Sequence, residues 1–255
     1  MLHDLEKYYR AQNIYPEDFH CCHLDECSKN CAKFTEATSA FVGTQYERGS
    51  FPRLLFISLD PGSGEKGDPD PIKRTPKFVR EDIERLDGRK IGKFQHWRET
   101  HRLAVVLLRQ FDPSISLETV TPFFAHVNSA KCTENNPSNA VAKHVLFENC
   151  RQYLHGELSV LKPDVIVTQG VEAANSLSIV LKGVNPAFGT ARQVILAGRP
   201  ILWVKTYHPS ARQRFREEKT KWPEFASALG DFIQLREGCD SEPEDRNLLS
   251  KFLPN

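Results

Sequence analysis

The chain has 255 residues, of which 40% are hydrophobic and 26% are charged, and its formal net charge is +1. This length favours one compact domain over residues 1–238, followed by a C-terminal tail at residues 239–255. No apolar run reaches the roughly 20 residues that a bilayer span requires, and the first residues lack the apolar centre of a secretory signal. We therefore expect a cytoplasmic protein that does not enter a membrane and is a monomer. The balanced charge neither indicates nor excludes a nucleic-acid partner, because a basic patch can lie within a balanced total.

Strand-like and helix-like runs alternate along the chain after an N-terminal segment rich in cysteine, "CCHLDECSKNC". Apolar runs rich in β-branched and aromatic residues predict strands at residues 53–59, 120–127, 164–168 and 194–206. Helical periodicity predicts helices at residues 97–111, 139–161, 171–181 and 222–235. This alternation predicts an α/β fold with a mostly parallel central sheet that is covered by helices.

The segment from about residue 63 to 95 does not fit this alternation. It mixes proline, glycine and charge, as in "GEKGDPDPIKRTPKF", and it is too long for an ordinary strand-to-helix loop. We expect it to be either a functional lid or an insertion with little structure of its own.

Polar residues lie just after three of the predicted strands, namely Asp60, Asn128 and His208. Each has a structural explanation: Asp60 can open a turn before Pro61, Asn128 can form a turn, and His208 can bind backbone. Ligands of parallel sheets lie outside the carboxyl ends of the strands. An acid, an amide and an imidazole at such ends together indicate a functional site.

Four segments, "LFISLDPG", "HVNSAKC", "LKPDVIVTQG" and "TYHPSA", occur in the order of the motifs of the uracil-DNA glycosylase superfamily. The chain resembles this superfamily from about Cys27 to Phe232, and it most resembles the iron-sulfur branch called family four. The resemblance implies a three-layer α/β/α domain that flips a pyrimidine nucleotide out of DNA and cleaves its N-glycosidic bond.

The resemblance also implies a role for each strand-end residue. Asp60 matches the catalytic carboxylate of the first uracil-DNA glycosylase family, which activates water and favours positive charge on the sugar. His208 matches the histidine that donates to the base oxygen as that oxygen gains charge. Asn128 matches the asparagine that reads the hydrogen-bonding edge of the pyrimidine.

The first motif departs from family four, where it reads Gly-Glu-Ala-Pro-Gly. Here Leu59 stands in place of the glutamate, and the acid has moved to Asp60. Gly62 stands where the first family has a tyrosine that closes the pocket, so a bulkier 5-substituted pyrimidine is a hypothesis for the substrate. The opposing explanation is that glycine is ordinary at this position and that the 63–95 segment or Phe78 fills the space. Phe78 is also a candidate to stack on the flipped base.

Residues after the histidine are the candidates for contacts with the DNA backbone. Ser210, Arg212 and Arg214 lie in "HPSARQR", and Arg212 falls near the residue that relatives insert into the minor groove. Alternatively, this run is a solvated helix face that is partly neutralised by Glu217 and Glu218.

The seven cysteines have no secretory context, which favours a metal site or buried thiols over disulfides. Members of family four hold a structural 4Fe-4S cluster with two N-terminal cysteines and a later pair. Cys132 and Cys150 match the later pair, and we select Cys27 and Cys31 for the first, with Cys22 as the substitute and Cys21 also available. Four thiolates also suit zinc, so the metal is not decided by the sequence.

Two functions from different classes follow. The first is a monofunctional DNA glycosylase acting on uracil or on a modified pyrimidine, such as a bulky 5-substituted cytosine of phage DNA, in repair or antiviral defence. The alternative is a non-catalytic DNA-binding or sensing module that keeps the fold and the metal. A metal-dependent hydrolase using His96, His101 and His126 or His144 is disfavoured, because their spacing matches no compact ligand motif.

Overall fold

The computed structural model describes residues 1–31, 33–61, 70–86, 95–134 and 142–240. Its centre is a six-stranded sheet whose strands are, in spatial order, β4 (Phe41–Val42), β6 (Phe124–Asn128), β5 (Leu54–Ser58), β8 (Val165–Gln169), β10 (Arg199–Thr206) and β9 (Thr190–Leu196). The four inner strands are parallel, and the two edge strands are antiparallel to their neighbours. The predicted mostly parallel sheet is confirmed.

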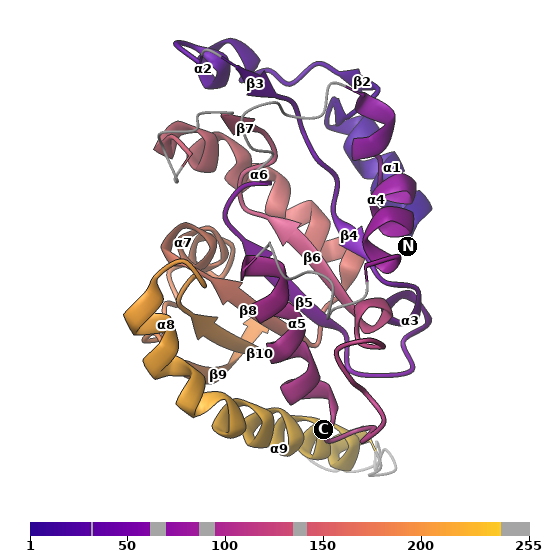
Figure 1. Ribbon diagram of the computed structural model, residues 1–255, viewed down its shortest axis with the longest axis vertical. Coiled ribbons are helices and arrows are strands. Elements are labelled where there is room, and N and C mark those ends of the chain that lie inside the picture. The colour runs from indigo at the N-terminus through magenta and orange to yellow at the C-terminus, as the bar shows by residue number, and fades with distance from the viewer. Residues whose placement is uncertain (32, 62–69, 87–94, 135–141, 241–255) are drawn as a thin grey trace, which may run out of the picture.

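Helices cover both faces of this sheet (Figure 1). The core on one face includes side chains of α1 (Leu2–Ala11), α6 (His144–Leu161) and α7 (Val171–Val180). The core on the other face includes side chains of α5 (Gln95–Leu108) and α9 (Trp222–Asp240). The arrangement is the expected three-layer α/β/α fold. The predicted helices are confirmed with shifted ends, and the helix predicted from residue 139 begins at His144.

The inner strands are apolar on both faces because successive side chains enter opposite cores. In β5, Leu55 and Ile57 pack in the core with α1 and α6, whereas Leu54 and Phe56 pack in the core with α5 and α9. All four side chains are fully buried. This double burial is why the sequence of the strand reads as an uninterrupted apolar run.

The single strand predicted at residues 194–206 is wrong, because this run forms the hairpin of β9 and β10. Leu196 pairs with Arg199, so Ala197 and Gly198 are the two turn residues. Both have positive φ angles, 48° and 79°, as a tight two-residue hairpin turn requires.

The 63–95 segment has ordered structure in its described part. It contains η1 (Pro71–Arg74) and α4 (Pro76–Glu84). The Arg80 guanidinium donates to the Val42 carbonyl oxygen of β4 over 2.5 Å and pairs with Glu47 of α3 (Thr44–Arg48) over 2.7 Å. The expectation of little structure is therefore wrong for residues 70–86, which cover the β4 edge of the sheet.

The remaining elements are short. Two small sheets are formed by β1 (Ile14–Tyr15) with β2 (Asp18–Phe19) and by β3 (Phe34–Thr35) with β7 (Thr133–Glu134), and the others are α2 (Leu24–Ser28), η2 (Thr121–Phe123), α8 (Arg212–Glu218) and η3 (Lys219–Lys221). The β3–β7 pairing and the packing of α2 on α6 bring the cysteine-rich segment beside the residues that follow β6. Within the described ranges, no helix is both long enough and apolar enough to cross a membrane.

Candidate active site

The inner strands end level with one another. Ser58 of β5 lies opposite Asn128 of β6, and Gln169 of β8 lies opposite Thr206 of β10. The Ser58 hydroxyl donates to Gln169 Oε1 over 2.9 Å, which joins the two pairs into one row. The residues after this row therefore share one edge, which we call the strand-end edge.

Asp60 is fixed at this edge by contacts between the segments after β5 and β6. Ser129 donates its backbone N–H to the Ser58 carbonyl oxygen over 2.9 Å, and Ala130 donates its N–H to the Leu59 carbonyl oxygen over 2.9 Å. The Thr133 hydroxyl then donates to Asp60 Oδ2 over 2.9 Å. The carboxylate is half-buried and oriented by a neighbour that the sequence did not single out.

His208 follows β10 and is half-buried beside the end of β8. Gly170 has a φ of 105°, and a Cβ there would lie 3.2 Å from the His208 Cβ and 3.2 Å from Leu59 Cδ2. The strand ends approach so closely that this position suits only glycine. Leu59 therefore packs against Gly170, whereas the Asp60 carboxylate accepts from Thr133.

The proton of the His208 ring is placed by Ser210. The Ser210 backbone N–H donates to Nδ1 over 3.2 Å, and its hydroxyl lies 2.7 Å from the same atom. An Nδ1 that accepts these bonds leaves the ring proton on Nε2. Burial lowers the pKa of His208 to about 4, so its ring is neutral at pH 7 and offers an Nε2–H donor.

A polar cluster, buried except for the half-buried His96, lies beneath His208; we call it the histidine array. His96 and His126 place Nε2 atoms 3.1 Å and 2.8 Å from the Ser58 hydroxyl oxygen. Gln169 Nε2 donates to the Thr100 hydroxyl over 3.1 Å, and that hydroxyl donates to the His96 carbonyl oxygen over 3.0 Å. Because Ser58 donates to Gln169, both histidines donate to Ser58. The array is Ser58, His96, Thr100, His126 and Gln169.

Both histidines of the array are neutral. Burial lowers the pKa of His126 to about 3, and the nearby Lys131 charge lowers it further. Burial also lowers the pKa of His96 well below its usual value, with smaller effects from His126 and His208. The array is therefore a set of neutral hydrogen-bonding groups.

The metal-hydrolase alternative gains no support from this cluster. His101 contacts the Trp97 carbonyl oxygen and the Thr121 hydroxyl, and His144 is exposed beside Glu148 on α6. Across the residues that the structure describes, no group of three or more His, Cys, Asp or Glu side chains is arranged to hold a metal ion.

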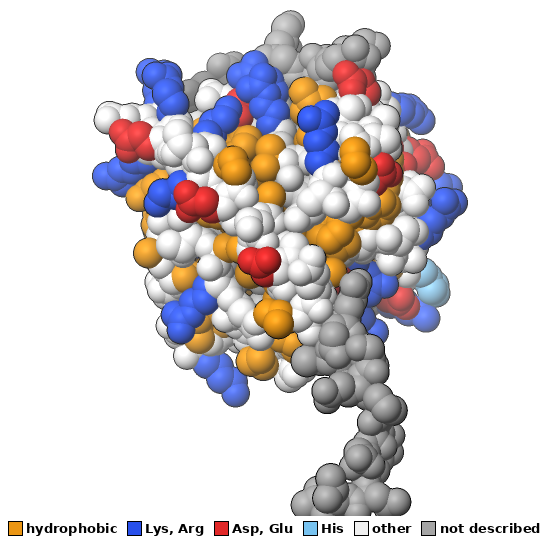
Figure 2. Space-filling model, turned by 90° about the horizontal axis from the view of Figure 1, so that it is seen from below, with side chains coloured by type: hydrophobic (Ala, Val, Ile, Leu, Met, Phe, Trp, Pro, Cys, Tyr) orange, Lys and Arg blue, Asp and Glu red, His pale blue; other side chains and the backbone are white. Residues whose placement is uncertain are grey.

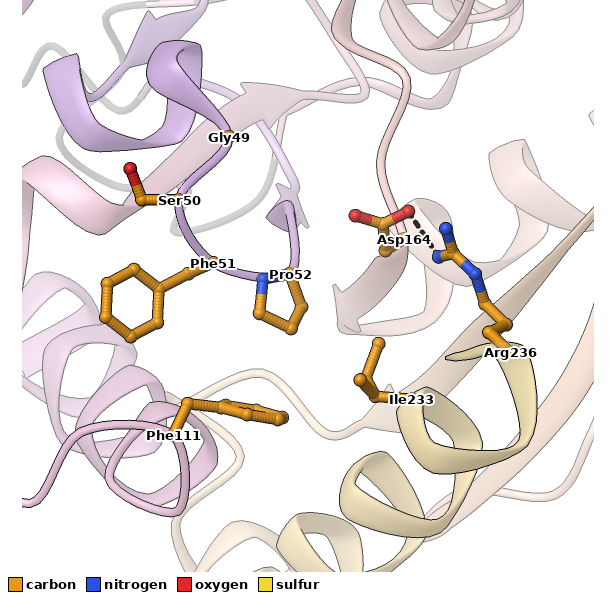
Figure 3. Close-up of a pocket in the computed structure, with 8 residues that line it drawn as sticks. All are labelled: Gly49, Ser50, Phe51, Pro52, Phe111, Asp164, Ile233 and Arg236. Carbon is orange, nitrogen blue, oxygen red and sulfur yellow. Dashed lines mark hydrogen bonds and ion pairs between the residues drawn. The ribbon is translucent and has the colours of Figure 1, made fainter. Parts of the chain in front are cut away.

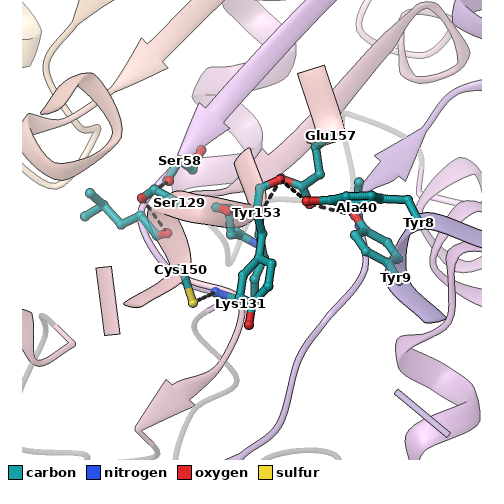
Figure 4. A network of polar contacts seen from close by, with 11 residues as sticks. Tyr8, Tyr9, Ala40, Ser58, Ser129, Lys131, Cys150, Tyr153 and Glu157 are labelled. Atoms are coloured by element: carbon teal, nitrogen blue, oxygen red, sulfur yellow. Dashed lines mark hydrogen bonds and ion pairs between the residues drawn. The ribbon is translucent and has the colours of Figure 1, made fainter. Parts of the chain in front are cut away.

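The backbone of Asn128 contacts a second buried cluster, which is drawn in Figure 4. We call this cluster the lysine network, and it consists of Lys131, Glu157 and Tyr9. The Lys131 ammonium donates to the Asn128 carbonyl oxygen and to Glu157 Oε2, each over 2.5 Å. The Tyr9 hydroxyl donates to Glu157 Oε1 over 2.7 Å and accepts from the Ala40 N–H over 3.1 Å. The network ties α1, α6 and the segment after β6 together beneath the base-reading candidate.

The cysteines gather at the other end of α6. Cys27, Cys132 and Cys150 are buried in one core, Cys21 packs against it, and Cys22 is exposed. Four sulfur atoms have a polar neighbour: Cys150 with the Lys131 N–H at 3.2 Å, Cys21 with the Tyr153 hydroxyl at 3.3 Å, Cys27 with Asn149 Nδ2 at 3.4 Å and Cys31 with Lys143 Nζ at 3.4 Å.

Burial raises the pKa of the Cys150 thiol to about 11, and it raises the pKa values of Cys132 and Cys27 as well. The thiols of Cys21 and Cys27 are close enough to contribute to the shifts at both Cys132 and Cys150. Without a metal the thiols of Cys27, Cys132 and Cys150 are protonated. The hydrogen-bond donors around them suit sulfur atoms that become negatively charged, which is what a bound metal produces.

Of the other predicted site residues, Ser210, Arg212 and Arg214 are exposed around the start of α8. Glu218 does not neutralise this helix face as expected, because it is buried and accepts the Tyr207 N–H over 2.9 Å. Phe78 is half-buried on α4, which contacts β4 and α1, and its stacking role stays a prediction. Gly62 lies outside the described residues.

A pocket of about 420 Å³ lies at the opposite edge of the sheet (Figure 3). Its wall includes Pro52, two residues before β5, and Asp164, immediately before β8, so it lies at the amino ends of the strands. The Asp164 carboxylate accepts from Arg236 Nη1 over 2.5 Å and from the Arg53 N–H over 2.9 Å. The Asp164–Arg236 ion pair ties α9 to the sheet. The candidate active site lies at the opposite edge of the sheet.

The lower face of the molecule, seen in Figure 2, has no surface that suits DNA better than the strand-end edge. Figure 2 shows its Lys and Arg side chains dispersed among hydrophobic and acidic ones, without a continuous basic band among the described residues of that face. The strand-end edge and α8 therefore remain the candidate interface.

Sequence signals existed for part of this site. Ser58 and Gln169 are polar residues at the ends of apolar strands, a position that marks the carboxyl edge of a sheet. His96, Thr133 and Glu157 carry no such signal, because only tertiary packing brings them to the edge.

Comparison with known proteins agrees with this geometry. The family model of the uracil DNA glycosylase superfamily matches residues 47–231, which is more than half of the chain. No curated protein matches the sequence. The match includes β5, β6, β8 and β10 with the polar residues at their ends. The chain therefore belongs to the uracil DNA glycosylase superfamily.

Proposed function

We propose that the protein is a monofunctional DNA glycosylase that hydrolyses the N-glycosidic bond of uracil or of a modified pyrimidine. The observation that carries this proposal is the grouping of Asp60, Asn128 and a neutral His208 on one sheet edge of a chain from this superfamily. A module that only binds DNA has no need of an oriented carboxylate and a neutral imidazole donor together.

The residues divide the reaction between them. The bond between C1′ and the base nitrogen breaks, and its electron pair leaves with the base. His208 Nε2–H donates to the base oxygen as that oxygen gains charge, and Asn128 holds the pyrimidine edge. Asp60, oriented by Thr133, stabilises the positive sugar and orients the water whose oxygen bonds to C1′. The proton released by that water neutralises the base.

The substrate is a uracil or a pyrimidine enlarged at carbon 5, such as a modified cytosine of phage DNA. Support comes from the first motif, where Leu59 replaces the acid of family four and packs against Gly170. The absence of a side chain at Gly62 adds to this support. An enzyme with this substrate serves in repair if the base is uracil, and in antiviral defence if it is a bulky modified base.

The test is base release from oligonucleotides containing uracil, hypoxanthine, 5-hydroxymethylcytosine or its glucosylated form, followed by alkali cleavage at the abasic site. Asp60→Asn is expected to reduce release by about 100-fold or more while DNA binding persists. Asp231→Asn, on the exposed face of α9, is the matched control and is expected to retain full activity. DNA binding with no base release from any substrate would instead support the sensing module.

We also propose that the cysteines hold a structural 4Fe-4S cluster, with zinc as the alternative. Cys27, Cys132 and Cys150 are the three proposed ligands. The described side chains are not already arranged as a metal-holding group, and the support is the burial of these three thiols together with the N–H donors near the Cys150 and Cys27 sulfurs. A bound cluster would join the N-terminal segment to α6. It supplies no step of base release.

Cys21 is favoured over Cys31 as the fourth ligand. Tyr153, which contacts Cys21, lies one helical turn from Cys150, whereas Lys143, which contacts Cys31, lies two turns away, roughly 10 Å along α6. The test is the iron and zinc content of Cys21→Ser, Cys31→Ser and Cys22→Ser proteins. Loss of metal only in Cys21→Ser is expected; loss only in Cys31→Ser would reverse the choice.

A further inference from the structure

The first turn of α5 rests on the turn that carries His208. Gln95 Nε2 donates to the Pro209 carbonyl oxygen over 3.1 Å. The His96 and His208 rings are stacked, with centroids 5.0 Å apart and planes 9° apart. One face of the His208 imidazole is thus covered by another imidazole.

His96 is itself held in place from below. Its Nε2–H donates to Ser58, whose hydroxyl oxygen also accepts from His126 and whose proton goes to Gln169. The Trp97 and His126 rings contact each other at a centroid distance of 4.7 Å beside it. The position of the His96 ring is therefore determined by the sheet rather than by the loop that contains His208.

We propose that His96 is a positioning residue that fixes the plane of the His208 ring and shields that ring from water. This inference rests on the proposed function. A donor that stabilises charge developing on a base oxygen must be aligned before the reaction, and small misalignment is costly. Ser210 fixes which nitrogen of His208 carries the proton, and His96 fixes where that nitrogen points.

The groups around the stack are consistent with a neutral pair. His96 and His101 come from α5, His126 from β6, and Lys131 from the segment after β6. Glu218 of α8 binds the Tyr207 N–H, one residue before His208. A proton on His208 Nδ1 would remove the acceptor of the Ser210 N–H and would place a charge against the half-buried His96 ring. The stacked arrangement therefore disfavours protonation of His208.

Two reciprocal variants test the inference. His96→Phe keeps a flat ring against His208 and loses the donor to Ser58, whereas His96→Gln keeps a donor and loses the ring. His144→Gln, an exposed histidine of α6, is the control. The pKa of His208 is measured by NMR titration of its ring nitrogens in each folded protein, and it requires no substrate.

We expect His96→Gln to raise the pKa of His208 from about 4 toward the usual value of a solvated histidine, and His96→Phe to leave it low. Single-turnover base release should fall about 10- to 100-fold in His96→Gln and by less in His96→Phe, which keeps the ring against His208 but loses the bond to Ser58. Equal behaviour of the two variants, or an unchanged titration in His96→Gln, would overturn the inference. If the wild type releases no base, the proposed function fails while the titration still decides the role of His96.

Discussion

Two buried polar clusters support the strand-end edge, and they differ in charge. The histidine array beneath His208 consists of neutral groups that share hydrogen bonds around the Ser58 hydroxyl. The lysine network beneath Asn128 contains an ion pair, Lys131 with Glu157, whose side chains are 3% and 1% exposed. The same edge thus places its proton-donating candidate over neutral groups and its base-reading candidate over a charged pair.

The two clusters are also coupled. The Lys131 charge contributes to the low pKa of His126 in the histidine array, after the larger effect of burial. The positive charge of Lys131 in the lysine network therefore helps to keep His126 of the histidine array neutral. The two clusters should therefore lose different amounts of stability when one member is removed. A neutral group that loses its partner costs less free energy than a buried charge that loses its counter-ion.

The largest expected effect follows from breaking the ion pair on one side. Lys131→Met leaves the Glu157 carboxylate buried without its cation, and we expect it to lower the free energy of unfolding by about 3–5 kcal/mol. The double variant Lys131→Met with Glu157→Gln should recover most of that loss, because glutamine can still accept from the Tyr9 hydroxyl. Urea denaturation measures both.

The control for this prediction is Lys7→Met on the exposed face of α1, which should change stability little. If Lys131→Met behaves like Lys7→Met, or if the double variant is as unstable as the single one, the pair does not stabilise the edge as a charged unit.

A smaller loss is expected on the neutral side. Ser58→Ala removes the acceptor of the His96 and His126 N–H groups, and we expect it to lower the free energy of unfolding by about 1–3 kcal/mol. Ser176→Ala is the matched control, because Ser176 is buried and its hydroxyl has no hydrogen-bond partner. Equal stabilities of the two variants would show that the array contributes nothing through Ser58.

The sequence predicted the sheet well for physical reasons that β8 illustrates. Val165 and Val167 face one core and Ile166 faces the other, so the strand is a short apolar run between polar ends. Such runs also locate the strand ends, which is why Asp60, Asn128 and His208 could be grouped in advance. Periodicity failed at Ala197 and Gly198, because a two-residue turn hardly interrupts the apolar pattern.

The supporting parts of the site could not be predicted from the sequence, because they depend on pairings between distant residues. His96 and His208 are separated by most of the sheet along the chain, and nothing local to either predicts their stack. Lys131 and Glu157 lie on different elements, and only the buried approach of α6 to the segment after β6 makes them partners. The sequence left Cys21 open as a metal ligand, and only its contact with Tyr153 of α6 favours it over Cys31.

The smallest effect concerns a carboxyl group on the neutral side. Burial raises the pKa of Glu218 to about 7, and its Oε1 atom has no hydrogen-bond partner. Because this folded-state pKa lies above the usual value for glutamate, the unfolded chain loses the proton first as pH rises. Stability should therefore be fully present at low pH and fall between about pH 4.5 and 7, by on the order of 1–2 kcal/mol.

Glu218→Gln should remove this dependence, since glutamine can accept the Tyr207 N–H without a charge. The variant is expected to be more stable than the wild type at pH 8 and similar to it at pH 5, as measured by thermal unfolding at the two pH values. Glu217→Gln, on the exposed face of α8, provides the comparison and should show neither effect. A wild-type protein that is equally stable at both pH values would mean that Glu218 is charged at pH 8 at no cost, and that the side of the edge beneath His208 tolerates charge after all.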